Sequence, residues 1–211
     1  MDLRQITIER EKYTIQLTPL QLTSIVKTLG NGCNFLVFGV GNDSSFWLEM
    51  NKGGKTIFIE DDKVWAENVK KKNPGIKILM VSYDTKRSNW ENLIDHPENL
   101  LLKIDDEVTN IKWDVILVDA PKGYEDEHPG RMKSIYQASI LIKNKGHVFV
   151  HDCERLVERA YTDKYLLKDN LIEEVSNLRH YFMGRNKMIF YKIKDYCFRV
   201  YKNFLAVWRK I

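Results

Sequence analysis

Three titratable residues follow two strand-like segments of the sequence, and their types suit proton transfer or metal binding. Asp119 stands at the end of the apolar run 115–119, and His151 and Asp152 stand at the end of the run 147–151. In an open α/β sheet, ligands bind outside the carboxyl ends of the parallel strands, so these side chains are expected to converge. Each residue alone has an ordinary alternative, since an aspartate after a strand often caps the next helix. Together they predict a catalytic site.

Two kinds of chemistry fit this group of side chains. Asp119, His151 and Asp152 can hold a divalent cation, and their mainly oxygen ligands favour Mg, Mn or Co over a closed zinc site. Such a cation binds an acceptor oxygen and lowers its pKa. Alternatively, His151 or Asp119 acts directly as the general base on an acceptor hydroxyl. The residue types leave both mechanisms open.

A glycine turn supplies the second signal. The segment 35–45 reads as a buried strand that runs into a turn and opens a helix, with candidate cofactor contacts at Gly39, Gly41, Asn42, Asp43 and Ser44. Such a turn lets a ligand approach the backbone closely, and the start of the helix offers unpaired N–H groups. Because a serine stands at the third glycine position of the dinucleotide pattern, the turn indicates a nucleotide-like cofactor without selecting NAD.

The ends of the second and third strands add further candidates for cofactor contacts. Glu60, with Asp61 beside it, lies about 20 residues after the glycine turn, where a carboxylate accepts hydrogen bonds from a ribose diol. Tyr83 and Asp84 stand where an adenine amino group needs an acceptor. Both strand ends have local alternatives, because Asp61 or Asp62 can cap the next helix and Asp84 can belong to a turn or a cap.

A long polar loop follows the fourth strand. Residues 122–132 are rich in turn formers and charge, and loops of this kind at a strand edge commonly contact substrates. Four basic residues in and after the loop can meet an acidic acceptor such as a uronate, namely Lys122, Arg131, Lys133 and Arg155. The alternative is a solvated loop in which Arg131 pairs with a local acid.

The elements that must position these residues alternate between strand and helix. Five short apolar runs predict parallel strands buried on both faces, at 35–39, 56–60, 76–81, 115–119 and 147–151. Amphipathic stretches between them predict helices at 44–51, 63–72, 88–106 with a break at Pro97, 131–143 and 154–168. This alternation predicts an α/β fold in which helices cover both faces of a mostly parallel sheet.

The flanking segments complete the predicted sheet. Thr18 and Pro19 predict the start of a helix that ends at Gly30. Segments 178–183 and 187–193, on either side of the turn 184–186, predict an antiparallel hairpin that closes the sheet. We therefore expect a single domain over 1–211, with a helical cap at 1–34, a core at 35–168, and the hairpin with a basic, aromatic tail at 169–211.

Length and composition narrow the class of protein. The chain has 211 residues, 44% of them hydrophobic, and a formal net charge of +4, which is too small a surplus to predict a nucleic-acid partner. The three widely spaced cysteines indicate a reducing compartment. The N-terminus does not resemble a signal peptide, and no apolar stretch reaches about 18 residues. We expect a soluble, cytoplasmic protein with no transmembrane segment.

Several blocks of the sequence resemble one known family. Over about residues 35–166 the chain is similar to the polysaccharide-biosynthesis family of plant glucuronoxylan 4-O-methyltransferases. The resemblance rests on the glycine turn and on three further blocks, Asp119-Ala120-Pro121-x-Gly123-Tyr124, Pro129-Gly130-Arg131-Met132 and Val148-Phe149-Val150-His151-Asp152, the last followed by Arg155 and Glu158. The Asp-Ala-Pro-x-Gly-Tyr and Pro-Gly-Arg-Met blocks are much more specific than the glycine turn.

The resemblance implies a class I methyltransferase with a Rossmann-like sheet and a C-terminal antiparallel hairpin. It implies transfer of a methyl group from S-adenosyl-L-methionine to a sugar hydroxyl of an oligosaccharide or polysaccharide, assisted by a divalent metal. The expected cofactor contacts include Asp119 and Ala120 besides the glycine turn and the acids named above. The expected substrate contacts are Lys122, Gly123, Tyr124, Arg131 and Arg155, around a transfer site formed by Asp119, His151 and Asp152.

Two departures from the family bear on the acceptor and on the length of the chain. Plant members resemble Golgi proteins with an N-terminal anchor, which these residues do not show, so the chain can be part of a larger multidomain polypeptide that builds glycans. Where plant members tend to carry a cysteine after the fifth helix, this chain reads Leu166-Leu167-Lys168. Uronic acid is therefore one candidate acceptor, and a deoxyhexose such as rhamnose is another.

Three other functions are weighed against this one. A nicotinamide-dependent oxidoreductase is disfavoured by the missing third glycine and by the closing hairpin. A non-catalytic glycan-binding module with the same fold is disfavoured because Asp119, His151 and Asp152 are all present. An RNA methyltransferase is disfavoured by the small net charge.

Overall fold

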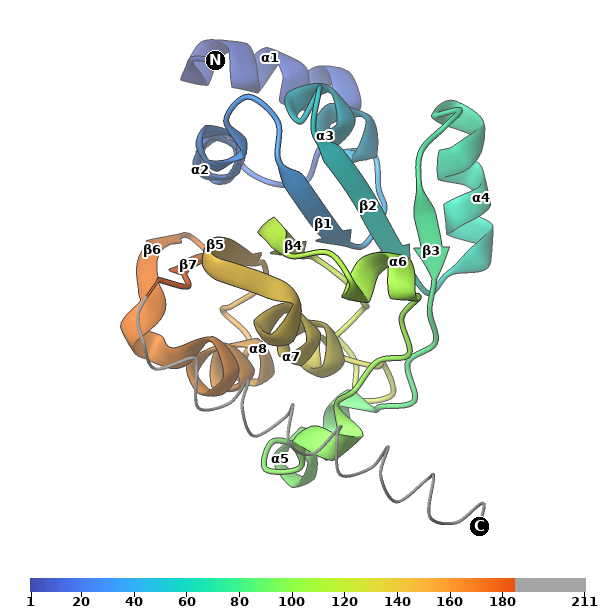
Figure 1. Ribbon diagram of the computed structural model, residues 1–211, viewed down its shortest axis with the longest axis vertical. Helices are drawn as coiled ribbons and strands as arrows, with labels where there is room; N and C mark the ends of the chain where they lie inside the picture. Colours follow the sequence, from blue (N-terminus) through green and yellow to red (C-terminus); the bar gives the residue numbers. More distant parts are fainter. Residues whose placement is uncertain (185–211) are drawn as a thin grey trace.

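A computed structural model describes residues 1–184 of the chain, and its centre is one seven-stranded sheet (Figure 1). The strand order is β3-β2-β1-β4-β5-β7-β6. β7 runs antiparallel to its neighbours β5 and β6, and the other neighbouring strands are parallel. The strands are β1 (Asn34–Phe38), β2 (Lys55–Glu60), β3 (Ile78–Met80), β4 (Trp113–Val118), β5 (Ile142–Val150), β6 (Leu171–Val175) and β7 (Leu178–Phe182).

Each of the five parallel strands overlaps one of the five apolar runs, although β5 begins five residues before its run and β3 covers only the middle of one. β1 pairs with β2 on one side and with β4 on the other, so the order of the strands reverses beside β1. Phe35 and Val37 of β1 belong to one hydrophobic core, and Leu36 and Phe38 belong to the other, on the opposite face of the sheet. Burial on both faces explains why these strands are apolar at successive positions. Ligand sites in such sheets lie at the reversal point, outside the carboxyl ends of the strands.

Helices cover both faces of the sheet, as the sequence predicted (Figure 1). On the face of Phe35, the core takes side chains from α1 (Leu3–Tyr13), α2 (Pro19–Leu29), α3 (Ser44–Met50) and α4 (Lys63–Lys72). On the face of Leu36, it takes side chains from α5 (Trp90–Leu93), α6 (Asp106–Thr109), α7 (Met132–Leu141) and α8 (Leu156–Thr162). The three layers leave the carboxyl ends of the strands as the accessible edge.

Local signals set several helix termini. Thr18 and Gln21 form a capping box, and Pro19 occupies the first position of α2. Asp62 caps α4, since its carboxylate accepts the Trp65 N–H at 2.9 Å. α1 lies inside the segment expected to be a helical cap, but Ile6 is its buried residue and the rest of it faces outward, so its periodic signal is weak.

The closing hairpin lies one strand earlier than the sequence pattern predicts. The segment predicted as its first strand, 178–183, forms β7, which is the second strand, and β6 precedes it. Ser176, at φ 57°, and Asn177 lie in the turn. β6 is at the edge of the sheet and its middle residues, 172–174, are exposed, so it lacks the apolar run that marks a buried strand. The predicted strand 187–193 and the tail 196–211 lie outside the described residues.

Two predicted helices are interrupted in the structure. The stretch 88–106 contains the single turn of α5, a 3-10 turn at Pro97–Asn99 and the start of α6. Proline disfavours helical geometry in the residue before it, which separates the two helices. The stretch 154–168 begins as α8 and continues through a π-helical turn, Asp163–Leu167. Within residues 1–184, no helix is both long and apolar enough to cross a membrane.

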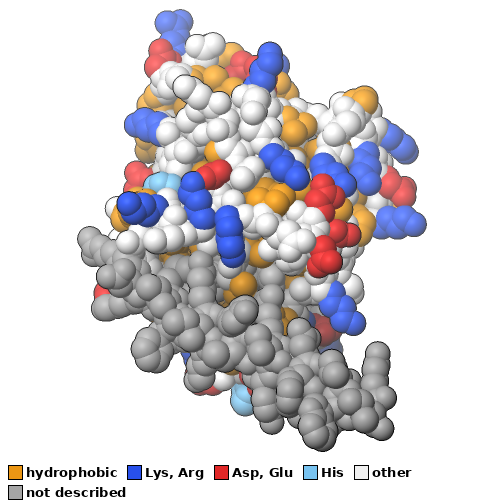
Figure 2. Space-filling view, viewed as in Figure 1, with side chains coloured by type: hydrophobic (Ala, Val, Ile, Leu, Met, Phe, Trp, Pro, Cys, Tyr) orange, Lys and Arg blue, Asp and Glu red, His pale blue; other side chains and the backbone are white. Residues whose placement is uncertain are grey.

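Basic and acidic side chains are interspersed on the molecular surface. On the face shown in Figure 2, lysine and arginine side chains alternate with acidic and apolar ones over the described residues. The small net charge of the chain is therefore not concentrated into one broad basic area on this face.

Candidate active site

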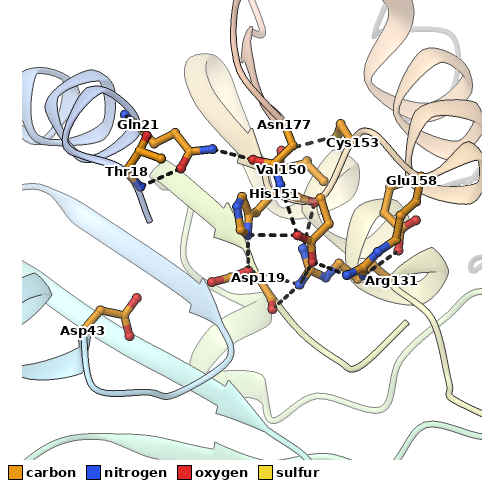
Figure 3. A network of polar contacts seen from close by, with 12 residues as sticks. Thr18, Gln21, Asp43, Asp119, Arg131, Val150, His151, Cys153, Glu158 and Asn177 are labelled. Atoms are coloured by element: carbon orange, nitrogen blue, oxygen red, sulfur yellow. Dashed lines mark hydrogen bonds and ion pairs between the residues drawn. The ribbon is translucent and has the colours of Figure 1, made fainter. Parts of the chain in front are cut away.

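The ends of β4 and β5 bring Asp119, His151 and Asp152 together (Figure 3). One ligand-capable atom of each lies within 4.8 Å of the others. The backbone holds these strand ends beside β1, because the Asp119 N–H donates to the Phe38 carbonyl at 3.0 Å and the His151 N–H donates to the Val118 carbonyl at 3.0 Å. The group therefore lies at the reversal point of the sheet, where ligands of such folds bind.

Both carboxylates hold the imidazole of His151. Its Nδ1 lies 3.0 Å from Asp119 Oδ1 and 3.4 Å from Asp152 Oδ1. Burial lowers the pKa of His151, but the hydrogen bond to Asp119 and the charges of the two acids outweigh this effect, so the pKa lies above its usual value. When Nδ1–H donates to Asp119, the other ring nitrogen, Nε2, is the one that can accept a proton.

Arg131 is buried and contacts Asp119, His151 and Asp152 from inside the protein. Its side chain is 6% exposed, and its guanidinium donates to the carbonyls of Asp119 and His151 at 2.7 Å each. The same guanidinium lies 3.1 Å from Asp119 Oδ1 and 2.7 Å from Asp152 Oδ2. Burial raises the pKa of Asp119, but the Arg131 charge and the His151 hydrogen bond outweigh it and hold that pKa below its usual value. The sequence predicts Arg131 as an acceptor contact, whereas the structure directs its donors at neighbouring protein groups.

Asp152 links Asp119 and His151 to the turn between β6 and β7. Its backbone is left-handed, at φ 60°, a conformation that aspartate adopts more readily than bulky residues. Oδ2 accepts from Arg131 and from Arg155 at 3.0 Å, and Oδ1 lies 3.4 Å from Asn177 Nδ2. The amide of Asn177 accepts in turn from Gln21 at 2.6 Å, as Figure 3 shows. The β6–β7 turn and α2 therefore support the position of Asp152.

The glycine turn after β1 passes close to the end of β4. Gly39 has φ 111°, and a Cβ built there would lie 2.9 Å from Ala120 Cβ, so both the backbone and the close approach require glycine. The Gly41 N–H donates to Ser44 Oγ at 2.9 Å, which fixes the start of α3. Asn42 lies exposed between them.

Asp43 and Glu60 organise the same turn through uncharged partners. Asp43 accepts from the Trp47 indole at 2.8 Å, and burial, together with the charge of Asp119, raises the pKa of Asp43 to about 6. Glu60 is buried, and its carboxylate accepts the N–H groups of Val40, Asp61 and Asp62 at 2.9–3.0 Å. A carboxylate has about four lone-pair directions, so one of those on Glu60 is left for a ligand. Asp61 is exposed beside it.

The two candidates at the end of β3 have partners on or near α7. The Tyr83 hydroxyl and Ser134 Oγ are hydrogen-bonded at 2.8 Å, and burial raises the pKa of Tyr83. Asp84 lies 2.5 Å from Lys133 Nζ, a hydrogen bond that keeps the pKa of Asp84 below its usual value. The carboxylate expected to meet adenine is thus paired with the lysine expected to meet an acidic acceptor. Both residues line a cavity of about 630 Å³.

The loop after β4 is closed at its base and tied to the segment after β3. The Gly130 N–H donates to the Lys122 carbonyl at 3.0 Å, and the Arg87 N–H donates to the His128 carbonyl at 2.7 Å. Lys122 is exposed, and so is Tyr124, whose ring lies 4.2 Å from that of His128 between centroids. The two ends of the loop are therefore fixed by backbone hydrogen bonds. Its polar side chains lie near Asp119, His151 and Asp152, which we call the transfer group.

Three residues near the site carry contacts to which the sequence assigned no role. Asn177 supports Asp152 from a turn whose position the hairpin prediction missed. Arg87 fastens the loop and carries no recognisable sequence signal. Glu158 lies beneath the loop, since a Cβ on Gly123 would come within 2.9 Å of Glu158 Oε1. Its place in the block that resembles the family was the only available indication.

The donor set at the ends of β4 and β5 fits a divalent cation. Asp119, His151 and Asp152 offer carboxylate oxygens and an imidazole nitrogen at close range, a combination that Mg, Mn and Co accept. Two arginines, Arg131 and Arg155, lie beside the two aspartates and partly balance their charge. The buried Glu158 lies behind Arg155, and burial raises the pKa of its carboxyl.

Comparisons with known sequences agree on one family. A family model described as IRX15/IRX15L/GXM matches residues 20–100 and 100–181. Glucuronoxylan 4-O-methyltransferases 2 and 3 of Arabidopsis thaliana are 39% and 41% identical to the chain and cover 75% and 71% of it. Arabinogalactan O-methyltransferase 2 of the same plant is 37% identical and covers 71%. The matches span 62%, 57% and 60% of these relatives, so the chain corresponds to about three fifths of their length.

A solved structure confirms the fold. The MycE methyltransferase of the mycinamycin biosynthetic pathway, in complex with Mg and SAH, matches with a TM-score of 0.51 over 88% of this chain and 49% of that chain. The two sequences are 13% identical, so the likeness concerns the fold. The chain has a class I methyltransferase fold, whose mostly parallel sheet and antiparallel C-terminal strand agree with the predicted fold class.

Proposed function

Because the chain belongs to the IRX15/IRX15L/GXM family, we propose that it is a glycan O-methyltransferase that uses S-adenosyl-L-methionine as the methyl donor. The acceptor is a hydroxyl of a sugar in an oligosaccharide or polysaccharide, either a uronic acid or a deoxyhexose. The observation that carries the proposal is the group of Asp119, His151 and Asp152 at the reversal point of a methyltransferase sheet. The names of relatives that act on glucuronoxylan and arabinogalactan support the glycan acceptor.

The proposed cofactor side is the glycine turn with the ends of β2 and β3. Asp43 and Glu60 receive hydrogen bonds there from an indole and from backbone N–H groups, which leaves their charge without a basic side-chain partner in those contacts. S-adenosylmethionine carries an ammonium and a sulfonium, so it suits a site with excess negative charge. The contacts that we assign to it are Gly39, Gly41, Asn42, Asp43, Ser44, Glu60, Asp61, Tyr83, Asp119 and Ala120.

Methyl transfer requires the acceptor oxygen, the methyl carbon and the donor sulfur to lie in line. The oxygen–carbon bond forms while the carbon–sulfur bond breaks, S-adenosylhomocysteine leaves, and the hydroxyl proton passes to a base. His151 is the proposed base, because Asp119 holds its Nδ1–H and thereby presents Nε2 for the proton. The charges of Asp119 and Asp152 stabilise the imidazolium that results.

The same three side chains are the proposed metal ligands. A divalent cation, when bound, lowers the pKa of the acceptor hydroxyl and so supplies part of the activation. Asp119, His151 and Asp152 would hold it, with Arg131 keeping the two carboxylates in place. His151 then serves as a ligand rather than as the base, which separates the two mechanisms experimentally.

The direct test is transfer of a labelled methyl group to defined oligosaccharides, followed by mass spectrometry. Matched acceptors that end in a uronic acid or in a deoxyhexose identify the sugar. We expect one labelled methyl group per acceptor and equimolar S-adenosylhomocysteine. If a metal activates the acceptor, chelator should remove the activity and added Mn, Mg or Co should restore it. Full activity in excess chelator would identify His151 as the base that takes the hydroxyl proton. Transfer to neither acceptor would contradict the proposal.

A second test concerns the cofactor alone. Glu60→Ala removes the carboxylate that orders the turn and offers a lone pair to ribose, so the dissociation constant for S-adenosylmethionine should rise at least about tenfold in calorimetry. Glu67→Ala, on the exposed side of α4, is the matched control. An unchanged dissociation constant in Glu60→Ala would remove the ribose assignment.

A non-catalytic glycan-binding role is the second candidate, because one relative carries a name that states no activity. Protein IRX15-LIKE of Arabidopsis thaliana is 33% identical over 78% of the chain. Asp152→Asn separates the candidates: an enzyme loses transfer and retains the glycan, whereas for a binding module the wild type itself shows no transfer. Calorimetry with the oligosaccharide and the labelled-methyl assay give the two readouts.

A further inference from the structure

Glu158 is a buried carboxylate that the proposed chemistry does not use. It lies in the first turn of α8 and is 0% exposed. Neither of its carboxylate oxygens has a hydrogen-bond donor. A buried charge without donors is strongly unfavourable, so the position needs a nearby countercharge or a functional reason. Figure 3 shows Glu158 on α8, next to the group that contains Arg131 and Asp119.

Two countercharges act on Glu158, Arg131 and the more accessible Arg155. Arg155 Nη1 lies 4.0 Å from Glu158 Oε1, and its Nη2 lies 3.0 Å from Asp152 Oδ2. The exposed Glu154 adds a third carboxylate, 3.9 Å from Arg155 Nε. The guanidinium is therefore attracted by Asp152 of the transfer group, by the surface acid Glu154 and by the buried Glu158, which cannot move into solvent. Asp152 alone would leave a long side chain free to swing, and the buried carboxylate restricts that motion.

Gly123, in the loop after β4, lies directly against Glu158 and Arg155. A Cβ at Gly123 would lie 2.9 Å from Glu158 Oε1 and 3.6 Å from Arg155 Nη1. Glycine is therefore needed for the loop to pass over Glu158. Since the base of the loop is fixed by the Gly130 to Lys122 hydrogen bond, the loop, Glu158 and Arg155 form one packed unit beside the transfer group.

Arg155 differs from the other basic residues that were expected to meet an acidic acceptor. Arg131 is 6% exposed and donates to protein carbonyls and carboxylates. Lys133 is also 6% exposed and contacts Asp84 and the Leu101 carbonyl. Arg155 is 25% exposed, although it contacts the same carboxylate as Arg131. Lys122 is exposed as well, but it forms no ion pair with Asp119 or Asp152. Of the four basic residues, Arg155 therefore combines an accessible side chain with a fixed place at the transfer group.

We propose that Arg155 binds the carboxylate of a uronic-acid acceptor and that Glu158 is the positioning residue that aims Arg155 at it. The proposal rests on the proposed function and names its acceptor class. A guanidinium offers paired N–H groups that match a carboxylate, so a uronate is recognised better than a deoxyhexose, which lacks the acid group.

The test measures binding first, so that it does not depend on turnover. Calorimetry in the presence of S-adenosylhomocysteine compares a xylo-oligosaccharide that bears glucuronic acid with the same compound after reduction of its carboxyl to an alcohol. The proteins are wild type, Arg155→Gln, Glu158→Gln and, as the control, Lys164→Gln, whose lysine pairs with the exposed Asp95. Arg155→Gln should raise the dissociation constant of the acid about tenfold, and Glu158→Gln about threefold or more.

The pattern across the two compounds decides the outcome. Both variants should bind the reduced compound as the wild type does, and Lys164→Gln should leave both dissociation constants unchanged. Equal weakening of both compounds by Glu158→Gln would show a structural role only and would overturn the positioning role. Equal affinity of the wild type for both compounds would overturn the assignment of Arg155.

Further variants and the transfer assay complete the test. If Glu158→Gln does not fold, Glu158→Asp provides the second variant, because its shorter side chain withdraws the carboxylate from Arg155 and should weaken only the acid. Transfer confined to the reduced compound would reject the uronate assignment and leave the methyltransferase proposal intact. Selective binding of the acid without any transfer would reject the methyltransferase proposal and leave the uronate assignment intact.

Discussion

The acids at the ends of β4 and β5 and the acids of the glycine turn differ in their counterions, although the two groups lie at the same edge of the sheet. Asp119 and Asp152 contact Arg131, and Asp152 also contacts Arg155. Asp43 receives its hydrogen bond from the uncharged indole of Trp47. Accordingly, the pKa of Asp119 lies below its usual value and that of Asp43 is raised to about 6.

The acids at the ends of β4 and β5 have their counterions within the protein. The acid of the glycine turn, Asp43, has no such basic partner. Paired carboxylates stay ionised and keep a fixed geometry, which suits proton transfer or metal binding. Asp43 is half-buried and has no basic side chain in hydrogen-bond contact, so a cationic ligand would stabilise its charge further. The contrast supports the placement of a sulfonium cofactor at the turn and of the acceptor at the arginines.

Removing Arg131 should give the largest effect. Arg131→Ala removes the buried guanidinium that contacts both carboxylates and leaves Asp152 with Arg155 and Asp119 with His151, so we expect a loss of about 3–5 kcal/mol in the free energy of unfolding, measured with denaturant. Arg159→Ala, whose arginine is exposed and pairs with Glu174, should cost about 1 kcal/mol or less. Similar losses in both variants would mean that the acids at the two strand ends do not depend on Arg131.

Asp119→Asn should affect catalysis more than folding. The amide cannot stabilise a positive His151, so the pKa of His151 should fall and the turnover number should decrease about 100-fold. The pH profile of turnover and the NMR titration of the histidine measure the two effects. Asp114→Asn, at the start of the same strand, is the control and should leave both unchanged. A normal histidine titration in Asp119→Asn would break the proposed link.

Gly39→Ala should disturb the boundary between the two regions. The added Cβ meets Ala120 Cβ at 2.9 Å and the backbone keeps a positive φ, so we expect a loss of about 2–3 kcal/mol in unfolding free energy and weaker cofactor binding. Gly75→Ala also has a positive φ, 93°, but nothing lies within 4 Å of its Cβ, so it should cost about 1 kcal/mol. Equal losses would show that backbone strain alone matters at Gly39.

Asp43→Asn should give the smallest effect and the opposite sign. A carboxylic acid whose pKa is raised in the folded state contributes stability below about pH 4, and that stability is lost as the pH rises through about 6. The amide avoids the buried charge, so without cofactor the variant should be about 1–2 kcal/mol more stable at pH 7.5 and no more stable at pH 3.5. Thermal unfolding across this pH range measures the effect, and a stability gain at pH 3.5 would contradict it.

Cofactor binding provides the complementary readout for the same variant. If Asp43 balances a cationic ligand, Asp43→Asn should bind S-adenosylmethionine about tenfold more weakly while its free form is more stable. Wild-type affinity should also fall as the pH drops below about 6, because Asp43 then takes up a proton. Unchanged affinity in the variant would leave the raised pKa without a role in binding.

The parallel sheet and the convergence of Asp119, His151 and Asp152 could be predicted because they follow from local patterns and from the geometry of parallel strands. Successive apolar residues mark strands such as β1 and β4, and strand ends gather at one edge. β6 could not be found in this way, since an edge strand with exposed residues has no such pattern. The contact of Asp84 with Lys133 could not be predicted either, because it depends on the path of the chain between β3 and α7.

The sequence by itself determined the fold class, the family and the types of residue at the transfer site, since these depend on hydrophobic periodicity and on blocks of neighbouring residues. Only the tertiary structure decided which arginine is buried and which is accessible: Arg131 fills the space between two strand ends, and Arg155 lies at the start of α8. It also decided that Glu158 has no donor of its own. Such properties depend on contacts between segments distant along the chain, where sequence spacing carries no information on distance or burial.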